Sequence, residues 1–212
     1  MATRRTTRAR QDYLKALYAL GGSGGIVPTS RLAEDGLVVL ASGRGARLSA
    51  AGRRVALDLV RRHRILESFL VRVLGLDWSE VHADAEILEH HVSDRVLEAM
   101  DRLAGHPRED PHGHQIPDAR GRFKRRPLLP LSALPKGAAA VVREIRDADR
   151  RRMSRWKQIG LVPGAPVVVR EVRPLDDVFE LEVGGKTLVS GGAGLEGILV
   201  QLTRRGSHAP AR

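Results

Sequence analysis

The spacing of apolar residues changes near Pro127, and this change limits the chain to a fold with two different parts. Before Pro127, apolar residues recur at helical spacing over residues 10–20, 49–74 and 81–103. After Pro127, short apolar runs alternate with turn residues, and a Gly-Gly pair between two runs is a strong hairpin signal. We therefore expect a mainly α N-terminal part and a small C-terminal β-barrel. The expected C-terminal elements are a basic helix at residues 149–159 and strands at 138–145, 167–172, 178–183, 186–189 and 198–202.

The composition fits a cytoplasmic protein with two modest domains. The chain has 212 residues and no cysteine, which excludes disulfides and thiolate metal sites and favours a reducing compartment. No apolar run approaches the roughly 18 residues that a membrane span needs, so we expect no membrane partner. The net charge of +11 favours polyanions such as nucleic acid, but a GC-rich, arginine-rich proteome would produce the same charge.

A β-hairpin is predicted shortly after a glycine-rich break in the N-terminal part. Residues 28–30 suit the start of a helix, because proline fixes φ and hydroxyl side chains accept from free N–H groups. Gly36 suits the end of that helix. Strands at residues 37–40 and 46–48, joined by a turn at 42–45, then form the hairpin. This pattern is typical of the wing of a DNA-binding domain.

Histidines and carboxylates gather on two predicted helical segments. His63 and Glu67 are one helical turn apart. The second segment carries His82, Glu86, Glu89 and His90 at offsets of 0, 4, 7 and 8 residues. Such a helix face can bind a divalent metal ion through oxygen and imidazole ligands if a further element completes the coordination. The alternative from spacing alone is a solvated polar face with helix salt bridges.

Several motifs in this order resemble the DtxR/MntR family of metal-dependent transcriptional repressors. In the N-terminal part they read DYLKALY, LSAAGRRVALDLVRRHRILESFLVRVLGLDWSEVHADAEILEHHVSD and GHPREDPHGHQIP. In the C-terminal part, LSALPKGAAAVVREI, GLVPGAPVVVREV and GILVQL resemble the SH3-like (FeoA-like) domain of larger members. The resemblance implies a winged helix-turn-helix, a helical dimerisation domain that holds Mn(II) or Fe(II), and a homodimer that binds operator DNA. The metal would shift a pre-existing equilibrium toward the DNA-competent geometry.

The resemblance also implies a primary metal site. Asp12 stands where family members place a ligand on the first helix, and Glu86 stands where iron-type members have Cys and manganese-type members have Glu. Glu89 and His90 match the shared Glu-His ligands. Oxygen ligands with one imidazole suit Mn(II). Lys15 replaces a Glu ligand of manganese-type members, and its ammonium group disfavours a binuclear manganese pair.

An ancillary metal site is implied by further matches. His63, Glu67 and His82 match its ligands, and Asp149 aligns weakly with a carboxylate that the SH3-like domain supplies in some members. Arg152 occupies the next ligand position and cannot bind a metal ion. The remaining histidines of this part, interpreted as neighbours or as loop and packing residues, are His91, His106, His112 and His114.

The family's helix-turn-helix needs about 20 residues or more before the wing, for two helices and a turn. Here only residues 28–35 lie between the glycine-rich break and the wing. We therefore predict that the recognition helix is lost or fused to a remnant. Phosphate or minor-groove contacts would then come from basic residues, which otherwise are ordinary solvated charges. The candidate DNA-binding residues are Arg4, Arg5, Arg8, Arg44 and Arg47.

These observations favour a metal-dependent regulator over an enzyme, since no motif places a general base beside a metal-bound water. We expect an abridged winged-helix domain at residues 1–56, a metal-binding and dimerisation domain with its linker at 57–126, an SH3-like domain at 127–203 and a tail at 204–212. The alternative is a metal-binding dimeric module of the same family that lacks operator specificity.

Overall fold

The structure, a computed structural model, describes residues 8–19, 33, 35–40, 46–124, 126–146 and 149–203. The chain divides into two compact units, which are described separately. The first comprises residues 1–75, 83–108 and 115–123, and the second comprises 76–82, 109–114 and 124–212. The helix expected at residues 28–35 and the turn at 42–45 fall largely or wholly outside the described residues. In the described part, no helix has the length and apolar character needed to cross a membrane.

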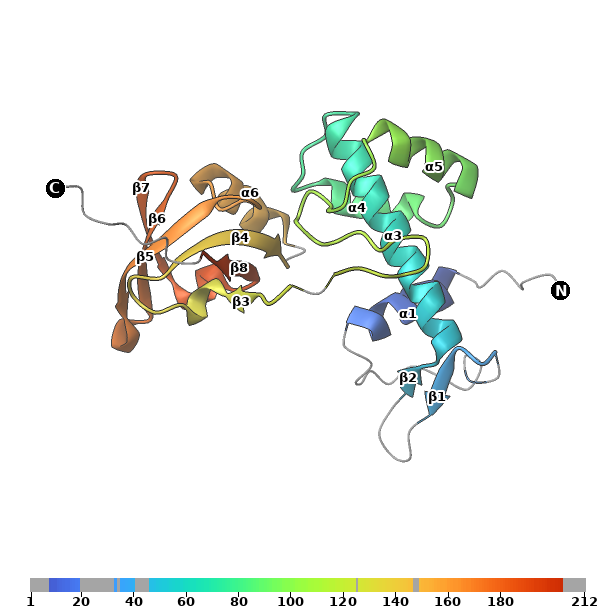
Figure 1. Ribbon diagram of the computed structural model, residues 1–212, viewed down its shortest axis with the longest axis horizontal. Coiled ribbons are helices and arrows are strands. Elements are labelled where there is room, and N and C mark those ends of the chain that lie inside the picture. The colour runs from blue at the N-terminus through green and yellow to red at the C-terminus, as the bar shows by residue number, and fades with distance from the viewer. Residues whose placement is uncertain are drawn as a thin grey trace. The chain divides into compact units, whose positions relative to one another are not determined.

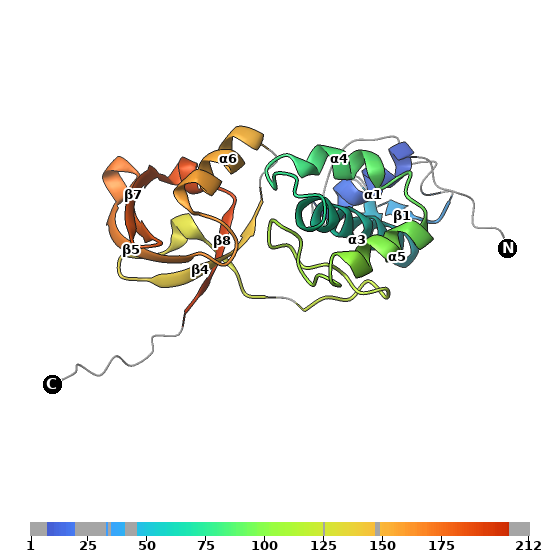
Figure 2. The same ribbon diagram turned by 90° about the horizontal axis from the view of Figure 1, so that it is seen from above.

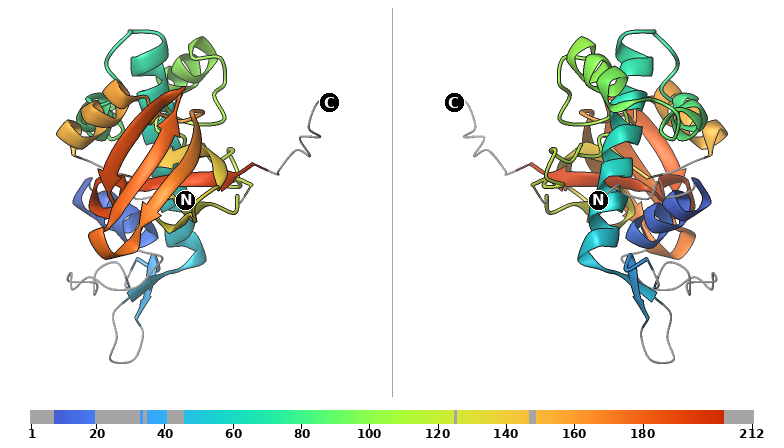
Figure 3. Two further views of the ribbon diagram at one scale, coloured as in Figure 1. Left: turned by 90° about the vertical axis from the view of Figure 1, so that its left-hand side faces the viewer. Right: turned by 90° about the vertical axis from the view of Figure 1, so that its right-hand side faces the viewer.

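The first unit is built around one long helix. Helix α1 (Arg8–Ala19) and the hairpin of β1 (Val38–Leu40) and β2 (Ala46–Leu48) pack at the N-terminal end of α3 (Ala50–Arg72), as Figure 1 and both views of Figure 3 show. Their apolar faces form one core because each element buries one side. The buried members of this core are Leu14, Leu17, Val38, Ala46 and Ala56.

The wing expected from the sequence is present and leads directly into α3. Val38 pairs with Leu48 and Leu40 with Ala46 in an antiparallel register. Ser49 is the N-cap of α3, because its Oγ accepts a hydrogen bond from the backbone N–H of Gly52 at 3.0 Å. The wing therefore has a fixed connection to the helix on which α1 packs.

The prediction of a single helix at residues 81–103 is wrong, because the structure has two helices in this segment. Helix α4 (Val81–Leu88) ends just before the predicted ligands Glu89 and His90, and α5 (Asp94–Leu103) begins after the N-cap Ser93. Arg62 of α3 reaches into the break and donates hydrogen bonds to the carbonyl oxygens of Glu89 (3.0 Å) and Val92. A partner from another helix thus satisfies carbonyl groups that a continuous helix would have bonded itself.

The linker predicted within residues 57–126 follows α5, and specific contacts hold its backbone. In the first unit, Arg61 donates to the carbonyl oxygen of Pro117 at 2.9 Å, and Arg64 donates to that of Gln115 at 2.5 Å. Residues 109–114 belong to the second unit. The described residues of this segment are therefore held by hydrogen bonds and do not form a flexible linker.

The second unit contains a six-stranded antiparallel sheet in the order β3-β8-β4-β5-β6-β7. Figure 2 labels strands β4, β5, β7 and β8 of this sheet. Its strands are β3 (Leu129–Pro130), β4 (Ala139–Ile145), β5 (Pro166–Arg173), β6 (Val178–Val183), β7 (Lys186–Gly191) and β8 (Ile198–Leu202). Short 3-10 turns are η1 (Leu131–Ala133), η2 (Pro174–Asp176) and η3 (Gly192–Leu195). The expected fold class is confirmed, and the sheet is not closed, since β3 and β7 form its two edges.

The basic helix α6 (Arg150–Ile159) lies where the sequence predicts it. Asp149 is its N-cap and accepts from the backbone N–H of Arg151 at 2.7 Å. Trp156 is buried and donates through Nε1 to the carbonyl oxygen of Gly194 at 3.0 Å, which fixes α6 beside the sheet. Both glycines of the β6–β7 turn have positive φ, as the Gly-Gly signal requires.

Candidate metal centre

Helix α1 and the turn after α4 bring three of the four predicted primary ligands together. His90 Nε2 lies 2.9 Å from Asp12 Oδ1 and 3.5 Å from Glu89 Oε1. One ligand atom from each of these residues lies within 4.8 Å of the others. The side chain of Glu89 is 1% exposed and that of Asp12 is 51% exposed, so the group opens to solvent on the side of α1. Asp12 and His90, which are 78 positions apart in the sequence, therefore converge in space.

Gln11 orients the imidazole of this group. Its Oε1 lies 2.9 Å from His90 Nδ1, which donates the hydrogen bond when it carries the proton. Nε2 is then the nitrogen that faces both carboxylates. Outer partners of this kind fix the tautomer and ring orientation of a metal-binding histidine. The sequence analysis missed Gln11, because nothing in the local pattern indicates which ring a glutamine on α1 will meet.

Glu86, the fourth predicted primary ligand, lies on α4 and is exposed. Among the described residues, the group of three ligand atoms within 4.8 Å does not include it. The helix ends two residues after Glu86, so Glu89 and His90 lie in the turn that follows it. Its role as a ligand stays a prediction.

His63 and Glu67 of α3 form a buried pair beside Glu89. His63 Nε2 lies 2.9 Å from Glu67 Oε1, and His63 Nδ1 lies 2.7 Å from Glu89 Oε2. Burial lowers the pKa of His63, but the charge and hydrogen bond of Glu67 and the hydrogen bond of Glu89 outweigh it and raise the pKa to about 9. The imidazole is therefore protonated at neutral pH and neutralises buried carboxylate charge.

Lys15 also contacts Glu89. Its Nζ donates to Oε1 at 3.0 Å and to Oε2 at 2.9 Å, and it lies 3.1 Å from His63 Nδ1. Burial raises the pKa of Glu89, but the hydrogen bond of His63 and the charge of Lys15 outweigh burial and keep that pKa below its ordinary value. Glu89 is thus a buried carboxylate with two cationic neighbours.

The other predicted ancillary ligands lie in the second unit. His82 is half-buried near the start of α4. Asp149 uses its Oδ1 to cap α6. Arg152 donates to the carbonyl oxygens of Ala193 (3.3 Å) and Glu196 (2.7 Å). Membership of His82 and Asp149 in an ancillary site stays a prediction.

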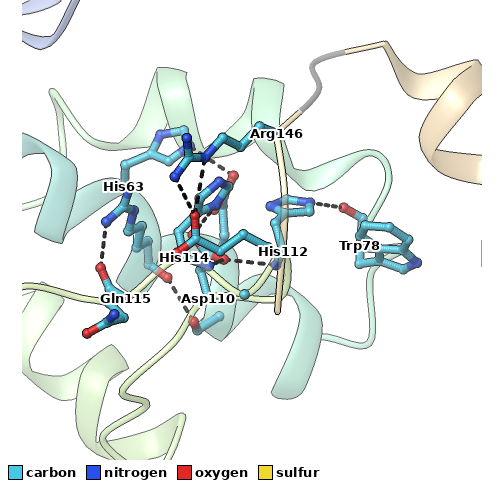
Figure 4. A network of polar contacts seen from close by, with 12 residues as sticks. His63, Trp78, Asp110, His112, His114, Gln115 and Arg146 are labelled. Carbon is cyan, nitrogen blue, oxygen red and sulfur yellow. Dashed lines mark hydrogen bonds and ion pairs between the residues drawn. The ribbon is translucent and has the colours of Figure 1, made fainter. Parts of the chain in front are cut away.

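A further group of donors lies in the loop at residues 109–114. Asp110 Oδ1 accepts from the backbone N–H groups of His112 and His114, and Asp110 Oδ2 lies 3.1 Å from His114 Nδ1. His112 is buried, and its Nε2 donates to the carbonyl oxygen of Trp78 at 2.7 Å (Figure 4). One ligand atom from each of Asp110, His112 and His114 also lies within 4.8 Å of the others, so the loop and packing roles of the two histidines stay a prediction.

Of the candidate DNA-binding residues, Arg47 is described in full and is exposed on β2. Arg4, Arg5 and Arg44 lie outside the described residues, as does the side chain of Arg8. Contact of these arginines with DNA therefore stays a prediction.

The donor atoms at Asp12, Glu89 and His90 fit a hard or borderline divalent cation. They are carboxylate oxygens and an imidazole nitrogen, and the chain has no cysteine to supply sulfur. This set suits Mn(II) or Fe(II). Helices that present such a group beside a β-hairpin, in a chain that also has an SH3-like sheet, indicate the class of metal-dependent transcriptional regulators.

Comparison with known proteins agrees with that class. Residues 49–118 match the iron dependent repressor, metal binding and dimerisation domain, and residues 129–200 match the FeoA domain. The chain belongs to the DtxR/MntR family of metal-dependent transcriptional repressors, which are not enzymes.

Individual relatives include both iron- and manganese-dependent repressors. The iron-dependent repressor IdeR of Mycobacterium leprae is 36% identical over 164 residues, which cover 71% of this chain and 70% of the relative. A manganese-dependent transcriptional repressor in complex with manganese is 34% identical with a TM-score of 0.82, covering 92% of this chain and all of that one. A second structure of a manganese-dependent transcriptional repressor is 36% identical, also with a TM-score of 0.82.

Proposed function

We propose that this protein senses Mn(II) or Fe(II) through Asp12, Glu89 and His90 and regulates transcription in response. The observation that carries this proposal is the convergence of α1 with the turn after α4, which places two carboxylates and an imidazole within 4.8 Å. A bound divalent ion would supply positive charge that neutralises these carboxylates. Manganese is the preferred metal because the donor atoms include no sulfur.

Metal binding acts on DNA binding through α1. This helix packs against α3 and β2, and it carries Asp12 at the metal group. An ion shared by Asp12 and the residues after α4 favours the state in which α1 is docked. Because the wing leads into α3, the same state fixes the wing.

The ancillary site proposed at His63, Glu67, His82 and Asp149 has a protonation requirement. The raised pKa of His63 means that its imidazole must lose a proton before it can ligate a metal ion. We therefore expect the ancillary site to fill less readily than the primary one at neutral pH.

The protein acts as a homodimer in this proposal. The matched family domain is a metal-binding and dimerisation domain, and it includes α4 and α5. These helices expose large apolar side chains at Ile87 (53%), Val96 (46%) and Leu103 (68%). Exposed apolar residues on helices of one domain suit burial against a second copy.

DNA is the proposed partner, with contacts by Arg47 on the wing and by Arg4, Arg5, Arg8 and Arg44. Arginine contacts to phosphates give affinity that falls with salt and carries little sequence information. The second candidate function is a metal-binding dimer without operator specificity. This second function is favoured because only eight residues, 28–35, are left for the helix-turn-helix, which is too few for two helices and a turn.

The experiment that separates the two functions selects duplex DNA from a random pool with and without Mn(II). A regulator enriches one palindromic sequence and shifts it in a gel only with Mn(II), and His90→Ala removes the metal dependence. DNA binding without sequence preference, with an affinity that falls steeply as the salt concentration rises, would support the metal-binding dimer and contradict the regulator.

A further inference from the structure

Lys15 occupies a position in which a cation neutralises the predicted metal ligand Glu89. Its Nζ donates to both carboxylate oxygens, at 3.0 and 2.9 Å. The Glu89 side chain is 1% exposed and that of Lys15 is 21% exposed, so the pair is largely withdrawn from water. An ammonium group that bonds both oxygens of one buried carboxylate supplies the charge that a bound metal ion would also supply.

Glu89 stands between two sets of neighbours. Its Oε1 lies 3.5 Å from His90 Nε2, which also faces Asp12, and its Oε2 lies 2.7 Å from His63 Nδ1. Any ion held by Asp12, Glu89 and His90 needs lone pairs of the oxygens to which Lys15 donates. It also meets the repulsion of a fixed positive charge on the same carboxylate.

We infer that Lys15 is a tethered cation that competes with the divalent ion for Glu89 and thereby weakens metal binding. The inference rests on the proposed function, because it concerns the same metal group. It goes beyond that function by giving the metal-free protein its own link between α1 and the turn after α4. Metal binding then exchanges one cation for another at Glu89 and does not fill an uncompensated acidic site.

The test measures Mn(II) affinity by calorimetry in the full-length chain and in three variants at position 15. Lys15→Met and Lys15→Gln remove the charge, and Gln keeps a hydrogen-bond donor in case Met destabilises the fold. Lys15→Arg keeps the charge and is the matched control. We expect the Mn(II) affinity of the Met and Gln variants to be about tenfold higher than that of the wild type, because two cations that bind one carboxylate oppose each other. The Mn(II) affinity of the Arg variant should equal that of the wild type.

A second readout is the melting temperature of the metal-free proteins. Lys15→Met and Lys15→Gln should melt below the wild type, because Glu89 loses a buried partner, and added Mn(II) should restore the loss. Equal or weaker Mn(II) affinity in both neutral variants would overturn the inference. Failure of the proposed function looks different, since Mn(II) would then bind to none of the four proteins, or bind equally after Asp12→Asn.

Discussion

His63 is a buried histidine whose charge is set by its neighbours. Glu67 and Glu89 lie within hydrogen-bond distance of its two ring nitrogens, at 2.9 and 2.7 Å. Together with Lys15 they form a compact cluster in which cations and carboxylates balance without a metal ion. A buried charge of this kind stabilises the fold only while its partner is charged as well. Protonation of His63 therefore contributes to the stability of the metal-free state.

The stability of the metal-free protein should fall as the pH rises from about 6.5 to 9. The folded-state pKa of His63, about 9, is above its ordinary value of 6.5, so its contribution is full below pH 6.5 and is lost as the pH passes 9. The loss should reach at most about 3 kcal/mol of unfolding free energy. Urea denaturation across this range measures it, with His63→Gln as the control. A wild type whose pH profile runs parallel to that of the variant would refute this assignment.

At the scale of elements, local signals predicted most of the secondary structure. Ser49 marks the start of α3, and the Gly-Gly pair marks the turn between β6 and β7. The break between α4 and α5 was not predictable, because residues 81–103 keep helical spacing and the partner of the free carbonyl groups is Arg62 of another helix. For the same reason the sequence indicated Asp12 and His90 but not the contact of Gln11 with His90.

Gly52 allows the wing to approach the first turn of α3. A Cβ atom at this position would lie 1.9 Å from the carbonyl oxygen of Leu37, which also accepts from the backbone N–H of Ser49. Alanine normally stabilises a helix relative to glycine by about 1 kcal/mol, but Gly52→Ala should instead destabilise the protein by about 1–3 kcal/mol. Chemical denaturation tests this, with the exposed Arg54→Ala as control. A Gly52→Ala protein at least as stable as the wild type would show that the wing does not pack so closely.

At the scale of the whole molecule, the family fold is retained while the segment before the wing is short. The match to a manganese-dependent repressor covers 92% of this chain. In the proposed function, the metal response depends on α1 and the turn after α4, whereas operator reading would depend on the segment before the wing, which is short in this chain. The proposed metal response and the proposed operator reading therefore depend on different parts of the chain and can be tested separately.

The measurement that tests the account most directly is the Mn(II)-dependent shift in melting temperature of the wild type and of Asp12→Asn and His90→Ala. At a free Mn(II) concentration one hundred times the Kd, binding to the folded state adds about 2.7 kcal/mol, which corresponds to a shift of about 5–10 °C for a chain of this size. We predict this shift in the wild type and its loss in both variants. A wild type that does not respond to Mn(II), or an Asp12→Asn protein that responds as fully as the wild type, would contradict a metal ion shared by α1 and the turn after α4.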